Sequence, residues 1–143
     1  MTEKTLNILL VEDDLVDVMN VQRAFKQHKI LNPLFIAENG LEALAMLRSQ
    51  DNAPGSLPAQ RRLVLLDINM PKMNGLEFLT ELRADPQIRA TPVIVLTTSD
   101  EDRDRVEAYN LNVAGYILKP VTFSNFAEVM RALNSYWALC EMP

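Results

Sequence analysis

The sequence has few of the features that mark secreted, membrane or nucleic-acid-binding proteins. Its one cysteine, Cys140, excludes a disulfide framework and a cysteine-based metal site. Lysine and arginine number 14 against 19 acidic residues, so the net charge is −5 and a basic nucleic-acid-binding face is not expected. No apolar run is long enough to cross a bilayer, and the opening MTEKTLNILLVEDD is unlike a signal peptide. We therefore expect a cytoplasmic protein without a membrane or nucleic acid as its partner.

The residues that are present fit one globular α/β domain. The chain has 143 residues, of which 48% are hydrophobic and 23% are charged, and this is enough to bury a core. We expect a single domain over 1–143, with a core at about 6–135 and an apolar C-terminal extension at 136–143. Five aliphatic runs are continuous rather than alternating, which is typical of strands buried on both faces of a parallel sheet. They are Asn7–Val11, Leu34–Ala37, Leu63–Leu66, Pro92–Leu96 and Gly115–Leu118.

Helix-like segments separate these runs. Three of them, at 14–28, at 40–50 and before Asp85-Pro86, carry apolar residues at helical spacing. The predicted buried stripes are Val18, Val21 and Phe25, then Leu41, Leu44 and Leu47, then Leu76, Leu79 and Leu82. A fourth segment at 99–109 has a thin apolar stripe, and a fifth spans about 124–139. The loop at 49–62, SQDNAPGSLPAQRR, is either functional or a tolerated insertion, and we favour the insertion.

Repeated β-α units with right-handed crossovers predict helices on both faces of the sheet and a ligand site at the carboxyl ends of the strands. Polar side chains follow the apolar runs at that edge: Glu12, Asp13 and Asp14 after the first, Asp67 after the third, Thr97 after the fourth and Lys119 after the fifth. Crowded carboxylates repel one another unless a cation lies between them. Oxygen ligands without histidine or cysteine favour Mg²⁺ or Mn²⁺. The sequence therefore predicts a metal site formed by Glu12, Asp13, Asp67 and a main-chain carbonyl just after Asp67.

The stretch VLLDINMPKMNG leads an apolar strand directly into Asp67 and then into a turn. A carboxylate in that position can act as a nucleophile toward phosphorus, while Thr97 and Lys119 bind the phosphoryl oxygens. Each feature also has an ordinary structural explanation. The acids after the first strand, and Thr97 with Ser99, would cap helices, and the lysine would lie at the surface. Their occurrence together at four strand ends favours phosphoryl chemistry.

The stretches ILLVEDD, LVLLDINMPKMNG, VIVLTTS and YILKP resemble the receiver domain of bacterial two-component response regulators, over almost the whole chain. The resemblance implies a flavodoxin-like α/β fold, with a five-stranded parallel sheet in the order 2-1-3-4-5 and five helices on its two faces. It also implies individual roles. These are Asp67 as the phosphoacceptor, Asp13 as a direct ligand of Mg²⁺ (or Mn²⁺), Glu12 as a ligand through water, Asn69 as a main-chain oxygen ligand, Thr97 and Lys119 as phosphoryl-binding groups, Thr97 and Tyr116 as switch residues, and Pro120 as a cis-proline.

The loop at 49–62 and the aromatic end SYWALCEMP further resemble the stand-alone regulators paired with cyanobacterial and bacterial phytochromes. This implies a phytochrome-type sensor histidine kinase as the phosphodonor. It also implies a homodimer through the fourth helix, fifth strand and fifth helix, although Trp137 could equally pack on its own core. The dimer candidates are Tyr136, Trp137, Leu139 and Met142. Without an output domain, we expect signalling through protein contacts and no enzymatic activity beyond the chain's own phosphotransfer and autodephosphorylation.

Other functional classes stay open from the residues alone. A phosphorelay shuttle would use the same acceptor site. A haloacid-dehalogenase-type phosphatase also combines a strand-end aspartate with Mg²⁺, but it needs a second aspartate at the position of Asn69. A flavin- or nucleotide-binding module needs a Gly- or Ser/Thr-rich loop where this chain has Glu12, Asp13 and Asp14. A degenerate receiver would bind partners without being phosphorylated.

Overall fold

The computed structural model describes residues 6–27, 29–49, 56–68, 73–97 and 110–118, with the single positions 128, 131, 132 and 135. Within these residues no helix has the length and apolar character needed to span a membrane. The helices and strands follow one another as β1 (Asn7–Val11), α1 (Leu15–Gln27), β2 (Leu34–Ala37), α2 (Gly40–Arg48), β3 (Arg62–Asp67), α3 (Gly75–Ala84), β4 (Val93–Thr97) and β5 (Gly115–Leu118).

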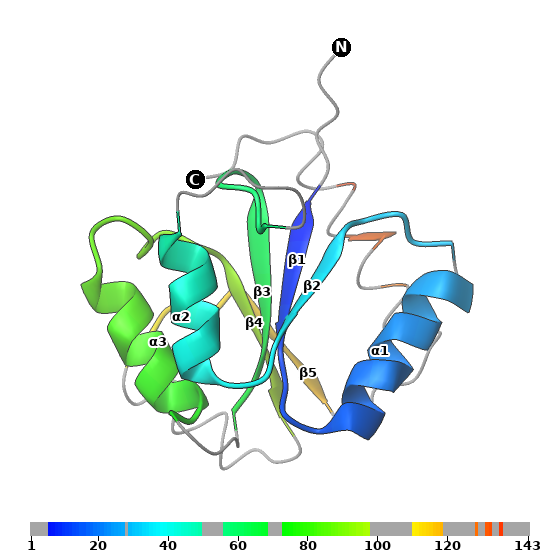
Figure 1. Cartoon of the computed structure of the whole chain (residues 1–143), viewed down its shortest axis with the longest axis horizontal. Coiled ribbons are helices and arrows are strands. Elements are labelled where there is room, and N and C mark those ends of the chain that lie inside the picture. The colour runs from blue at the N-terminus through cyan, green and yellow to red at the C-terminus, as the bar shows by residue number, and fades with distance from the viewer. Residues whose placement is uncertain are drawn as a thin grey trace.

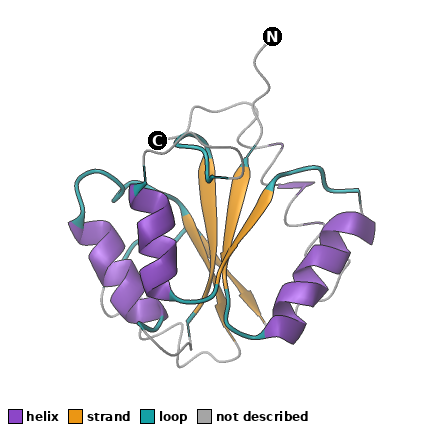
Figure 2. Ribbon diagram, in the orientation of Figure 1, coloured by secondary structure: helices purple, strands orange, loops and turns teal. Residues whose placement is uncertain are grey.

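The five strands form one parallel sheet in the order β2-β1-β3-β4-β5, as predicted. Helix α1 covers one face of the sheet, and α2 and α3 cover the other, giving the three layers seen in Figures 1 and 2. The carboxyl ends of the strands lie at the lower edge in Figure 1, where β1 leads into α1. The expected fourth helix lies outside the described residues. At positions 128, 131, 132 and 135, within the expected fifth segment, the backbone is helical.

Alternate residues of each strand divide the core between the two faces, because successive side chains of a strand point to opposite sides. In β1, Ile8 and Leu10 pack with α1, whereas Leu9 and Val11 pack with α2 and α3. The predicted α1 stripe of Val18, Val21 and Phe25 is buried in the first of these clusters. Burying one such aliphatic side chain contributes about 1.5–3 kcal/mol. Helices therefore pack on both faces of the sheet, and the loops lie at the two edges where the strands begin and end.

Helix α2 buries a different stripe from the predicted one. Leu44 and Leu47 are buried, but Leu41 is 56% exposed, so this part of the prediction was wrong. The helix begins at Gly40 with Asn39 as its N-cap, and a Cβ atom on Gly40 would lie 2.9 Å from the carbonyl oxygen of Met73. This close approach turns the glycine inward and Leu41 outward.

Helix α3 is fixed at both ends by polar groups. Asn74 and Glu77 form a capping box at its start, in which each side chain accepts a hydrogen bond from the backbone N–H of the other residue. Near its end, the Arg83 guanidinium donates hydrogen bonds of 2.7–2.9 Å to four carbonyl oxygens that lie before β4 or β5. Burial lowers the pKa of Arg83 from its ordinary value. These bonds tie the amino ends of β4 and β5 to α3.

Candidate functional site

Three acidic residues meet at the carboxyl edge of the sheet. Glu12 follows β1 directly and Asp67 is the last residue of β3. The register pairs Val11 with Leu66, so the next residues, Glu12 and Asp67, lie at the same level. Ligand oxygens of Glu12, Asp13 and Asp67 all lie within 4.8 Å of one another. The carboxylates that the sequence predicts as neighbours are thus neighbours in the structure.

The three members of this acidic cluster differ in their exposure to water. Glu12 is only 1% exposed and Asp67 6%, while Asp13 is exposed. The Glu12 Oε1 atom accepts a hydrogen bond of 3.2 Å from the backbone N–H of Asp14, and both Glu12 and Asp67 make further interactions. Two largely buried carboxylates therefore stand beside a third that water and an incoming ligand can reach.

Asp14 has a separate, structural role. Its Oδ1 atom accepts hydrogen bonds from the backbone N–H groups of Val16 at 2.8 Å and Asp17 at 3.3 Å. This is the bonding of an N-cap, which satisfies donors at the start of a helix. Helix capping thus explains Asp14, but not the grouping of Glu12 and Asp13 with Asp67.

Close backbone contacts join the residue after β3 to the start of α3. The Gly75 N–H donates a hydrogen bond of 2.9 Å to the Ile68 carbonyl, and a Cβ atom on Gly75 would be 2.6 Å from Ile68 Cα. Met73 has a φ of 73°, in the left-handed region that costs energy for a residue with a side chain. The sequence pattern did not predict this packing, because the contact of Gly75 with Ile68 depends on how β3 and α3 are placed.

The donor set of the cluster fits a hard divalent cation. It consists of carboxylate oxygens alone, as Mg²⁺ and Mn²⁺ prefer, without a histidine or cysteine. Carboxylates removed from water are costly unless opposite charge or hydrogen bonds compensate them. A cation between Glu12, Asp13 and Asp67 would provide that compensation.

The other predicted site residues are placed only in part. Tyr116 is half-buried in β5, where it pairs with Val95 and packs on the α2–α3 side of the core. Thr97 ends β4 opposite Leu118, but its side chain is not among those described. Outside the described residues lie Asn69, Lys119, Pro120 and the dimer candidates Tyr136, Trp137, Leu139 and Met142. Their roles stay predictions.

The sheet order and the acidic carboxyl edge define a class of protein, and comparison with known families agrees with it. The response regulator receiver domain matches residues 8–131. The chain belongs to this family. The match includes Glu12, Asp13 and Asp67 and all of the five strands except Asn7, the first residue of β1.

Its relatives include regulators associated with phytochromes. Response regulator Rcp1 of Synechocystis is 36% identical over 133 residues, which are 91% of this chain and 87% of Rcp1. A structure of Rcp1 in its Mn²⁺-bound form has a TM-score of 0.71 at 35% identity and covers 96% and 99% of the two chains. The bacteriophytochrome response regulator RtBRR has a TM-score of 0.78 at 36% identity, with 97% and 84% covered. The phosphorylated cyanobacterial phytochrome response regulator RcpA has a TM-score of 0.74 at 33% identity, and the match covers 97% of this chain and 99% of RcpA. The predicted resemblance to this subgroup is confirmed.

Proposed function

We propose that this chain is a stand-alone response regulator that accepts a phosphoryl group on Asp67 from a sensor histidine kinase. The observation that carries the proposal is the cluster of Glu12, Asp13 and Asp67, with ligand oxygens within 4.8 Å at the carboxyl ends of β1 and β3. Asp67 ends a strand whose six residues are all buried, so the rigid core fixes its position. A nucleophile held by a rigid element needs little reorganisation before it reacts.

The proposed reaction is a phosphoryl transfer between two side chains. A carboxylate oxygen of Asp67 forms a bond to phosphorus as the bond from phosphorus to the donor's histidine nitrogen breaks, and the electron pair stays on that nitrogen. Glu12, Asp13 and Asp67, with the main-chain oxygen of Asn69, would hold Mg²⁺ or Mn²⁺, which when bound offsets the negative charge on the phosphoryl oxygens. The Mn²⁺-bound form of Rcp1 supports this choice of cation. Thr97 and Lys119 are the proposed partners of the remaining oxygens.

Phosphorylation replaces the single negative charge of the Asp67 carboxylate with a phosphoryl group of about −1.5 to −2 charges, by analogy with other phosphorylated side chains, beside the carboxylates of Glu12 and Asp13. We propose that Thr97 and Tyr116 respond to this charge and that the face of the fourth helix, β5 and the fifth helix then changes. Tyr116 is half-buried in the edge strand β5, and this position supports the proposal that its side chain changes rotamer. The same face is the proposed homodimer surface, through Tyr136, Trp137, Leu139 and Met142.

The first turn of α1 suggests where the phosphodonor docks. Leu15 is 71% exposed, and Val16 and Met19 are also exposed, although all three are apolar. Leu15 follows Asp13 and Asp14 directly, so this apolar surface borders the acidic cluster. A donor histidine must reach Asp67 across that border, and exposed apolar residues there fit a protein partner. The names of RtBRR and RcpA support a phytochrome-type kinase as that partner.

The test is to incubate the purified chain with Mg²⁺ and acetyl phosphate and to measure the intact mass. We expect one added phosphoryl group, stable in acid and labile in base, and none in the Asp67→Asn variant. Normal labelling of that variant would remove the proposal. Multiple turnovers of a generic phosphate ester would instead favour the phosphatase alternative.

A further inference from the structure

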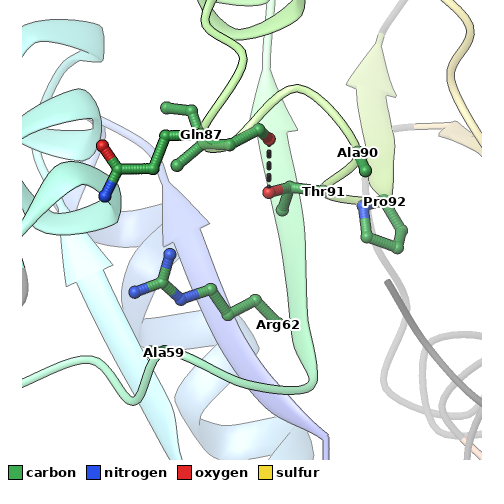
Figure 3. A pocket seen from close by; sticks show the side chains of 7 residues that line it. Ala59, Arg62, Gln87, Ala90, Thr91 and Pro92 are labelled. Atoms are coloured by element: carbon green, nitrogen blue, oxygen red, sulfur yellow. Dashed lines mark hydrogen bonds between the residues drawn. The ribbon is translucent and has the colours of Figure 1, made fainter.

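A cavity of about 100 Å³ lies at the amino edge of the sheet, across from the acidic cluster. Its lining includes the polar residues Arg62, Gln87 and Thr91 together with Ala59, Ile88 and Pro92 (Figure 3). Arg62 begins β3 and Asp67 ends it. At a rise of about 3.3 Å per residue, these two positions are about 16 Å apart. The cavity is therefore a feature separate from the proposed phosphoacceptor site.

Arg62 is the unusual member of this lining, since it is a charged residue that is only 8% exposed. Its Nε donates a hydrogen bond of 2.6 Å to the Pro58 carbonyl, and its Nη1 donates one of 2.8 Å to the Leu47 carbonyl. A guanidinium has five N–H groups, so three remain after these two bonds, including both on Nη2. No acceptor for them occurs among the described residues, where both ion pairs belong to Arg48 instead.

A buried cation destabilises a fold unless negative charge or hydrogen bonds compensate it, and among the described residues no carboxylate forms an ion pair with Arg62. Burial correspondingly lowers the pKa of Arg62 from its ordinary value, although an arginine remains protonated near neutral pH. The two backbone carbonyls compensate only part of the charge, because each is a neutral dipole. The remaining N–H groups make this cavity a place where an anion would be stabilised.

The size and lining of the cavity select the kind of anion. Its volume of about 100 Å³ leaves room for a small carboxylate. None of the described lining residues is acidic. The Thr91 hydroxyl already donates a hydrogen bond of 2.7 Å to the Ile88 carbonyl, drawn as a dashed line in Figure 3, so the available donors are the guanidinium and the Gln87 amide. A guanidinium edge pairs with the two oxygens of a carboxylate through parallel hydrogen bonds.

We propose that this cavity binds a small carboxylate, with Arg62 as its buried donor and Gln87 as a second donor at its mouth. The carboxylate is either that of a free small acid or that of an aspartate or glutamate side chain on a partner. Ala59 and Arg62 come from the end of the 49–62 loop, so the end of that loop acquires a binding role.

The test is a titration of the full ¹⁵N-labelled chain with sodium acetate, at constant ionic strength maintained with sodium chloride, followed by amide chemical shifts. We expect saturable shifts confined to residues 59–62 and 87–91, without shifts at residues 12–13 and 67. Two capped tripeptides, Gly-Asp-Gly and Gly-Asn-Gly, distinguish the sources. Binding of acetate shows that a free acid suffices, and binding of the aspartyl peptide alone assigns the carboxylate to a protein side chain. Linear shifts, or no shifts with either, would overturn the proposal.

Substitutions at the exposed Gln87 provide a matched pair that leaves the core intact. Gln87→Glu places a carboxylate at the mouth, where it repels or replaces the added one, so saturation by acetate should disappear. Gln87→Lys keeps a donor and adds positive charge, so saturation should be retained. Equal behaviour of the two variants would mean a general salt effect and would overturn the proposal. Arg62→Met should also lose binding, but it breaks two hydrogen bonds to the backbone. If that variant does not fold, the two Gln87 variants test the proposal.

Discussion

Gly75 lies so close to Ile68 that a Cβ atom on Gly75 would be 2.6 Å from Ile68 Cα, and a hydrogen bond of 2.9 Å joins its N–H to the Ile68 carbonyl. The same Cβ would be 3.0 Å from the Asp67 carbonyl oxygen. The contact therefore places the start of α3 directly against the end of β3, beside the proposed phosphoacceptor.

Gly75→Ala should destabilise the chain. Alanine is the better helix former by about 0.5–1 kcal/mol, but forcing a methyl group against backbone costs typically 1–3 kcal/mol and backbone cannot move aside as a side chain does. We expect a net loss of about 1–2 kcal/mol in the free energy of unfolding, measured by urea denaturation. Gly115→Ala is the control, since a Cβ there meets nothing within 4 Å, and its effect should stay within about 0.5 kcal/mol. Equal losses would show that the Ile68 contact is not the cause.

The strands could be predicted from sequence because aliphatic residues buried on both faces leave a continuous run. The runs for β1, β2 and β5 match the structure residue for residue. Strand β4 begins and ends one residue later than predicted, and β3 is one residue longer than predicted at each end, with Arg62 at its start and Asp67 at its end. Arg62 donates hydrogen bonds to the carbonyls of Pro58 and Leu47, and no pattern of apolar residues reveals such partners.

The acidic edge could also be predicted, since parallel strands bring all their carboxyl ends to one place. The cluster of Glu12, Asp13 and Asp67 was predicted, but the separate role of Asp14 as a helix cap could not be assigned from spacing, because adjacent acids differ only in where the chain turns. The buried face of α2 was mispredicted at Leu41 for a similar reason. The approach of Gly40 to Met73 sets the rotation of that helix, and this approach depends on a contact between distant parts of the chain.

Loss of Asp13 should weaken divalent metal binding. Two opposite unit charges at 4 Å attract by about 4 kcal/mol at an effective dielectric constant of 20, so Asp13→Asn should lower Mn²⁺ affinity by about tenfold or more. Isothermal titration calorimetry with Mn²⁺ measures this. Asp14→Asn is the matched control, because it removes a neighbouring charge from a residue outside the cluster, and asparagine caps helices as well as aspartate. Equal affinities of the two variants would place the cation elsewhere.

The ion pair of Arg48 with Asp85 predicts a pH dependence. Arg48 Nε donates a hydrogen bond of 2.8 Å to Asp85 Oδ2, and this bond, followed by one from the Gln87 N–H, lowers the pKa of Asp85 from its ordinary value. A carboxyl whose folded-state pKa is lowered contributes stability above its unfolded pKa and loses it as pH falls through the folded value. Asp85→Asn should therefore be less stable than the wild type near neutral pH.

This difference should shrink as pH falls below about 4, the ordinary range of an aspartate. Urea midpoints of the two proteins at several pH values between neutrality and pH 3 measure it. High salt should reduce the difference as well, since the pair is partly exposed and is screened. A difference that is constant with pH would mean that Asp85 stabilises the end of α3 through hydrogen bonds that asparagine cannot reproduce, rather than through its charge.

The apolar start of α1 predicts that one substitution there changes phosphorylation by a protein donor but not phosphorylation by a small-molecule donor. If Leu15 and Val16 contact the kinase, replacing both with serine should reduce phosphotransfer from a kinase that phosphorylates the wild type by about tenfold or more, as loss of a central interface contact does. Phosphorylation by acetyl phosphate should be unchanged, because that donor needs only the acidic cluster. Leu31→Ser is the control, since Leu31 is 91% exposed but precedes the amino end of β2, away from the carboxyl ends of the strands where the acidic cluster lies. An equal loss with both donors would mean that the α1 substitutions disturb Asp67 itself, whereas full transfer from the kinase would place the docking surface elsewhere.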